Sequence, residues 1–68
     1  MNEDDALSVL SIAADEIARL HGVELEKRED PSGRWVVSIE TDDWTMTGEG
    51  RSEAQALSDF IMNAQGAA

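Results

Sequence analysis

The side chains of this chain that could take part in chemistry are mostly carboxylates. The sequence holds 15 Asp and Glu residues, one histidine and no cysteine among its 68 residues. Without cysteine a chain has no disulfide, no thiolate zinc site and no cysteine nucleophile, and a reducing compartment such as the cytoplasm is expected. The histidine, His21, falls where a helix is predicted to end, and a cation there complements the helix dipole. We interpret it as a helix-end residue and not as a catalytic base.

Closely spaced carboxylates could also serve acid–base catalysis or hold a cation. Acid–base catalysis needs a carboxyl group whose pKa is raised in a desolvated cleft, and a domain this small offers no evident cleft. The acidic pairs at 4–5 and 42–43 lack the spaced ligands and central glycine of a calcium loop. The Gly-Glu-Gly run at 48–50 lacks the third glycine and the preceding parallel strand of a dinucleotide site. The sequence therefore predicts no enzyme, no metal site and no cofactor.

The net charge indicates the kind of partner. Fifteen acidic residues against five basic ones give a formal charge of -10. Such a charge disfavours binding to free nucleic acid or to an anionic membrane, and it favours a basic protein surface. The first residues are acidic and no apolar run approaches bilayer thickness, so neither a signal peptide nor a membrane span is expected. We expect a cytoplasmic monomer.

Two helices are predicted to frame the chain. Residues 4–21 place apolar side chains, Ile17 and Leu20 among them, on one helical arc, and Gly22 stands where a left-handed C-terminal cap belongs. Residues 54–64 carry a second apolar arc, and the preceding Ser52 forms a capping box with Gln55.

Three short strands are predicted between the helices, at residues 23–28, 34–40 and 44–48, with turns at 29–33 and 41–43. Pairing Arg28 with Arg34, and Ile39 with Trp44, keeps the apolar residues of all three strands on one face. Both tryptophans are expected in the core. The predicted fold class is α+β: a two-layer α-β-β-β-α domain over residues 1–68, with a three-stranded antiparallel meander and two helices packed on one face.

Carboxylates gather on the open face of the predicted sheet and at both of its ends. Glu24 and Glu26 are two strand steps apart, about 6.6 Å, which is near twice the rise of about 3.4 Å between phosphates along one DNA strand. No Lys or Arg is expected close to the carboxylates of the open face, whereas the end near residues 29–33 also gathers arginines. The alternative is a solvated face that keeps the protein soluble or adapts it to high salt. The carboxylates assigned to partner binding are Glu24, Glu26, Glu40, Asp42, Asp43, Glu29 and Asp30.

The run at 48–56, GEGRSEAQA, resembles the start of the final helix in the double-stranded-RNA-binding domain, which follows a similar Gly-x-Gly-x-Ser. That resemblance implies the α-β-β-β-α topology. The family's phosphate-gripping lysines are replaced here by Glu53 and Ala54, so binding to duplex RNA is not expected. The chain is also similar to small phage-encoded α-β-α sandwich proteins, in which a tryptophan-bearing strand precedes a short Ala-rich helix with a Ser or Thr cap. Its size, acidity and shape resemble DNA-mimic anti-CRISPR proteins.

The resemblance to anti-CRISPR proteins implies a phage or mobile-element inhibitor that blocks the basic DNA-binding groove of a bacterial defence complex, a CRISPR effector, by acidic DNA mimicry. Its carboxylates would pair with Lys and Arg that otherwise hold phosphates, and binding would fall with salt. The alternative is a non-enzymatic adaptor or structural domain. It would contact a partner or a second copy through Ile12, Met62 or the helix surfaces.

Overall fold

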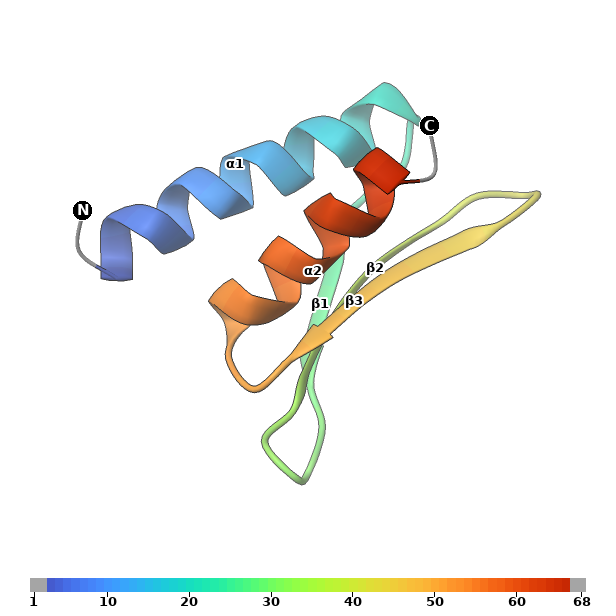
Figure 1. Ribbon diagram of the computed structural model, residues 1–68. Coiled ribbons are helices and arrows are strands. Elements are labelled where there is room, and N and C mark those ends of the chain that lie inside the picture. The colour runs from blue at the N-terminus through green and yellow to red at the C-terminus, as the bar shows by residue number, and fades with distance from the viewer. Residues whose placement is uncertain (1–2, 67–68) are drawn as a thin grey trace.

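The computed structural model describes residues 3–66 of the chain, and its elements follow the order α1, β1, β2, β3, α2. The helices are α1 (Glu3–Leu20) and α2 (Glu53–Gly66), and the strands are β1 (Glu26–Glu29), β2 (Trp35–Glu40) and β3 (Thr45–Gly50). The strands form an antiparallel sheet in the order β1-β2-β3, and both helices lie on one side of it (Figure 1). The predicted two-layer α+β fold is confirmed.

The core lies between the sheet and the two helices. Alanines on α1 and on α2 allow close approach, and the larger buried side chains come from β2 and α2. The buried apolar residues of the described chain are Ala14, Ala18, Val37, Ile39, Ala56, Leu57 and Phe60. The alternation predicted for the second strand is confirmed, because Val37 and Ile39 are fully buried and Glu40 is exposed.

Helix α1 ends in the predicted glycine cap. Gly22 adopts φ 70°, its backbone N–H donates to the Arg19 carbonyl at 3.0 Å, and the Val23 N–H donates to the Ala18 carbonyl at 3.1 Å. These two bonds form a Schellman motif, which turns the chain sharply out of the helix. Residues 23–25 then connect the helix layer to the sheet layer. For this reason β1 begins at Glu26, three residues later than predicted.

Helix α2 begins with half of the predicted capping box. The Gln55 backbone N–H donates to Ser52 Oγ at 3.2 Å, as expected for a serine N-cap. The side chain of Gln55, however, accepts from the Arg51 N–H at 2.9 Å and not from the Ser52 N–H. The Gln55 amide therefore also anchors the loop between β3 and α2.

The first hairpin is shifted by two residues from the predicted register. Arg28 pairs with Val36, and Glu29 pairs with Trp35, so the predicted Arg28–Arg34 pairing is wrong. The turn is closed at Asp30, whose backbone N–H donates to the Arg34 carbonyl at 2.8 Å. The observed register also avoids facing two arginines across the hairpin, an arrangement that is destabilising.

The second hairpin shows the same shift. Ile39 pairs with Met46 and not with Trp44, and Val37 pairs with Gly48. The physical cause lies in the turn, where Thr41 N–H donates to the Trp44 carbonyl at 2.8 Å and places the bend one residue later than predicted. Because the shift is an even number of residues, every side chain keeps its predicted face. What changes is the residue that each side chain faces on the neighbouring strand.

Helix α2 packs closely on β3. Gly48 is buried at the point of contact, where a Cβ atom would overlap the backbone of Phe60 and Ala56. Two α2 side chains also bind the free edge of the strand: Asn63 Nδ2 donates to the Thr47 carbonyl at 2.8 Å, and Asp59 accepts from the Glu49 N–H at 3.0 Å. These bonds occupy backbone groups that an edge strand otherwise leaves unpaired.

Candidate functional site

The β2–β3 hairpin extends beyond the C-terminal ends of both helices (Figure 1). We call residues 40–44 the tip. Thr41 Oγ1 holds the tip by accepting from the Asp43 N–H at 3.3 Å and from the Trp44 N–H at 3.1 Å. The side chains of Glu40, Asp42 and Asp43 are exposed. Three of the carboxylates predicted to bind a partner are thus brought together on one protruding turn.

Trp44 lies at the base of the tip, and its predicted place in the core is wrong. The side chain is 40% exposed, because the shifted register puts Met46 opposite Ile39 and moves Trp44 beyond the helices. Its ring meets the His21 ring edge to face, with centroids 4.9 Å apart. Trp35, by contrast, is half-buried against the core as expected.

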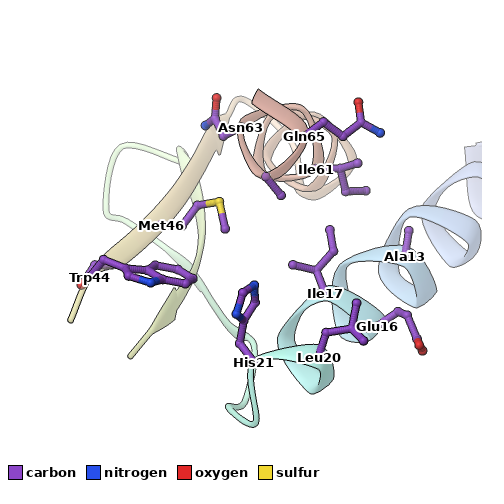
Figure 2. Close-up of a pocket in the computed structure, with 12 residues that line it drawn as sticks. Ala13, Glu16, Ile17, Leu20, His21, Trp44, Met46, Ile61, Asn63 and Gln65 are labelled. Carbon is purple, nitrogen blue, oxygen red and sulfur yellow. The ribbon is translucent and has the colours of Figure 1, made fainter. Parts of the chain in front are cut away.

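An open groove of about 960 Å³ lies between the C-terminal halves of the helices and the start of β3. Figure 2 shows Ile17 of α1, Ile61 of α2 and Met46 of β3 converging within it, with the His21 ring beside Trp44. Its apolar lining consists of Ala13, Ile17, Leu20, Trp44, Met46, Ile61 and Ala64. Of these, Leu20 is the most exposed at 76%, although its arc predicted a place against the core.

The groove lies at a negatively charged end of the molecule. Both helices end beside it, and the carbonyl groups at a helix C-terminus carry partial negative charge. The last turn of α2 has no basic residue, while Arg19 in the last turn of α1 is bound to Glu16 at 2.7 Å. The tip adds the carboxylates of Asp42 and Asp43, while Glu40 lies on the open face of the sheet. A cation placed in the groove therefore meets attraction from both helix termini and from the tip.

The open sheet face carries mixed charge. By the observed pairing, and the alternation of side chains along each strand, this face presents Glu26, Arg28, Val36, Ser38, Glu40, Thr45, Thr47 and Glu49. Arg28 thus occupies the position next to Glu26 on the same face. The expectation that no cation stands near the carboxylates of this face is wrong for Glu26. Glu24 lies outside β1, so the strand spacing predicted between Glu24 and Glu26 is absent.

The turn at the other end of the sheet uses its carboxylate internally. Asp30 Oδ1 accepts from Ser32 Oγ at 2.6 Å, from the Ser32 N–H at 3.0 Å and from the Arg34 N–H at 3.0 Å. The hydrogen bond from the Ser32 hydroxyl, followed by the one from the Arg34 backbone, lowers the pKa of Asp30 below its ordinary value. Asp30 therefore builds the turn, while Glu29 is exposed at the end of β1.

Charged side chains near this end also form ion pairs. Lys27 Nζ lies 3.1 Å from Glu53 Oε2, and Arg34 Nη2 lies 3.6 Å from Glu49 Oε2. The first pair links β1 to the first turn of α2, and the second links the first hairpin turn to β3. Carboxylates here are therefore partly neutralised by the chain itself.

The two apolar residues predicted as partner contacts are exposed but lie outside the groove. Ile12 is 67% exposed and Met62 is 66% exposed, and neither lines it. Sequence reasoning missed the groove residues because Leu20, Met46 and Ile61 follow the same periodicity as the core. One signal was present in the sequence. Trp44 directly follows the Asp-Asp turn, so it lies at the outermost position of its strand, where a helix packed on the sheet need not cover it.

Residues 3–66 meet the requirements of neither a metal site nor a membrane span in their geometry and composition. No group of three or more His, Asp or Glu side chains in this range is arranged to hold a metal ion, and neither helix is long and apolar enough to cross a membrane. No family model, curated protein or solved structure matches the chain. A function must therefore be inferred from the groove, the tip and the charge around them.

Proposed function

We propose that this chain is a non-enzymatic inhibitor that binds a basic, nucleic-acid-binding protein surface. The observation that carries the proposal is the tip, where Glu40, Asp42 and Asp43 are exposed on a turn that extends beyond the helices. Lys and Arg are absent from residues 35–50, so no cation adjacent in sequence neutralises them. Carboxylates in this arrangement attract Lys and Arg, which are the residues that hold phosphates in a nucleic-acid groove.

The most specific form of this proposal is an anti-CRISPR-type protein, encoded by a phage or mobile element, that occupies the DNA-binding groove of a CRISPR effector. The formal charge of -10 supports it, because a large field of one sign speeds association with an oppositely charged surface. In this proposal the tip and the adjoining helix C-termini mimic the charge of DNA. The sheet face is a poorer mimic, because Arg28 and Arg34 lie near its carboxylates and partly neutralise them.

Competition with labelled duplex DNA for a purified CRISPR effector tests this function. The triple variant Glu40→Gln, Asp42→Asn, Asp43→Asn is expected to bind the effector at least about tenfold more weakly, and wild-type binding is expected to fall with added salt. A matched variant, Asp4→Asn, Asp15→Asn, Glu29→Gln, removes the same charge away from the tip and is expected to keep most of the affinity. Equal losses in both variants, or binding unaffected by salt, would reject the tip as the mimic.

A second function, an adaptor domain that joins partner proteins, is favoured by the apolar groove. Leu20 and Trp44 are exposed at the groove and adjoin its half-buried apolar residues, and a continuous apolar surface of this kind is typical of a protein-binding site. The adaptor function predicts that the partner binds the tip triple variant as well as the wild type and loses affinity when the groove is altered. The two functions can therefore be distinguished by whether the tip or the groove contributes most of the binding affinity.

A further inference from the structure

We infer that the groove is the docking site for an amphipathic helix of the partner protein, with large apolar side chains on one face and Lys or Arg beside them. This inference rests on the proposed function, since it names the part of the basic partner that is recognised. It assigns the apolar half of the contact to the groove and the charged half to the tip and the helix termini.

The shape and lining of the groove suit apolar side chains presented by a helix. Ile17, Met46 and Ile61 are half-buried along its inner surface, and the exposed Leu20 and Trp44 flank it. The groove opens to solvent along its length and is bordered by two helices and a strand. Grooves of this kind receive apolar residues of a helix spaced at i, i+3, i+4 and i+7.

The polar lining argues against a small molecule. Small-molecule sites bring a few polar groups to bear on the ligand to fix its orientation. Here the Asn63 amide is bound to the Thr47 carbonyl, the Glu16 carboxylate is bound to Arg19, and the His21 ring packs edge to face on Trp44. Thr45 and Gln65 complete the polar lining, so five polar side chains stand against seven apolar ones and the groove offers mainly apolar area.

Charge selects a basic helix and argues against a second copy of the chain. Two copies each carry a formal charge of -10, so electrostatic repulsion opposes a contact between them. A Lys or Arg beside the apolar face instead approaches the tip carboxylates and the negative ends of α1 and α2. The last turn of α2, which lacks a basic residue of its own, is left to be complemented by the partner.

Titration of the ¹⁵N-labelled full chain with synthetic peptides tests the inference by NMR. The probe is a helical peptide with Leu on one face and Lys on both flanks. One control has the same composition in scrambled order, and the other replaces each Lys with Glu. We expect the probe to shift the Trp44 indole signal and the Ile61 amide signal, and to bind at least about tenfold more tightly than either control.

Leu20→Asp is the sharpest groove variant, because Leu20 is 76% exposed and its replacement leaves the core intact. The added carboxylate attracts cations, so a weaker affinity reports the lost apolar contact. Ile12→Asp is the matched control: the same type of change at a residue 67% exposed on α1 outside the groove. We expect about a tenfold loss for Leu20→Asp and less than about a twofold loss for Ile12→Asp, with circular dichroism confirming that both fold.

Several results would overturn the docking inference. These are equal binding of the scrambled peptide, no binding of the probe, signal shifts confined to residues away from the groove, and a concentration-dependent dimer that Leu20→Asp dissolves. The proposed inhibitor function fails separately. If Leu20→Asp still displaces DNA from the effector while the tip triple variant does not, the acidic inhibitor stands and the docking helix is rejected; the opposite pair of results rejects the tip and keeps the groove.

Discussion

The two hairpin turns of this protein carry acidic residues for different purposes. In the first turn, Asp30 accepts three hydrogen bonds from Ser32 and Arg34, and the adjoining arginine is within reach of Glu49. In the tip, the turn is held by Thr41, and the carboxylates of Asp42 and Asp43 are exposed at its centre. The first turn is held by the side chain of an acid, whereas the tip is held by the Thr41 hydroxyl.

This contrast shows how function can be separated from stability in a small acidic chain. Exposed carboxylates that repel one another lower stability, and they can serve solubility or the binding of a basic partner. Carboxylates that accept hydrogen bonds or pair with a cation contribute to the fold. The hydrogen-bond role of each acid, and not its position in the sequence alone, distinguishes the two groups.

The largest expected effect comes from disrupting the packing of α2 on β3, on which the sheet and both of its hairpins depend. Gly48→Ala puts a Cβ against the backbone of Phe60 and Ala56, which forces α2 away from β3. We expect a loss of about 3 kcal/mol in the free energy of unfolding, a large part of the stability of so small a domain. Urea unfolding followed by circular dichroism measures it.

Gly66→Ala is the matched control, because a Cβ at Gly66 meets nothing within 4 Å. An alanine in the last turn of α2 is expected to leave stability unchanged or to raise it slightly. If Gly48→Ala proved as stable as the control, the close contact between α2 and β3 would be incorrect.

A smaller effect is expected at the first turn. Asp30→Ala removes the acceptor for the Ser32 hydroxyl and for two backbone N–H groups, so the urea midpoint should fall. Asp30→Asn keeps one oxygen acceptor and should recover part of the loss. An Asp30→Ala variant as stable as the wild type would show that the turn forms without its acid, and the contrast with the tip would disappear.

The lowered pKa of Asp30 in the first turn predicts how folding stability changes with pH. The pKa of Asp30 is lowered in the folded chain by the Ser32 hydroxyl and the Arg34 backbone N–H. Its contribution is therefore fully present above the ordinary aspartate pKa of about 3.9, and it is lost as pH falls through the lowered value. Carboxyl NMR titration should place the midpoint of Asp30 below the ordinary aspartate value.

The smallest effect on stability is expected at the tip. Asp42→Asn and Asp43→Asn remove charges that make no contribution to the turn, so the free energy of unfolding should change by less than about 0.5 kcal/mol. Thermal unfolding at low and moderate salt measures it. A clear loss of stability in either variant would mean that these acids are structural, and the proposed role in partner binding would lose its basis.

Most of the fold followed from the sequence because it depends on periodicity. The α-β-β-β-α order, the glycine cap at Gly22 and the inward face of β2 all follow from local spacing and backbone preference. Register did not follow, because it depends on which residue closes each turn. The bonds of Asp30 and Thr41 decide that, and alternation of side chains constrains only whether the shift is even.

The candidate site was predicted only in its acidic half for the same reason. Glu40, Asp42 and Asp43 needed no more than a turn at 41–43 to be placed together. The groove forms because Trp44 lies closer to the turn than the Ile39–Met46 pair and because Leu20 is exposed at the end of α1. The first depends on the strand register and the second on how the helices are placed, and neither can be read from periodicity. A periodic apolar residue at the end of an element has the same pattern whether or not another element covers it.

The side chains of Asp59 and Asn63, which bind the outer edge of β3, also limit how copies of this protein can associate. A second copy that added a strand along β3 would first have to displace both side chains, so extension of the sheet is favoured at the β1 side. The two bonds thus oppose edge-to-edge aggregation of the native protein at β3.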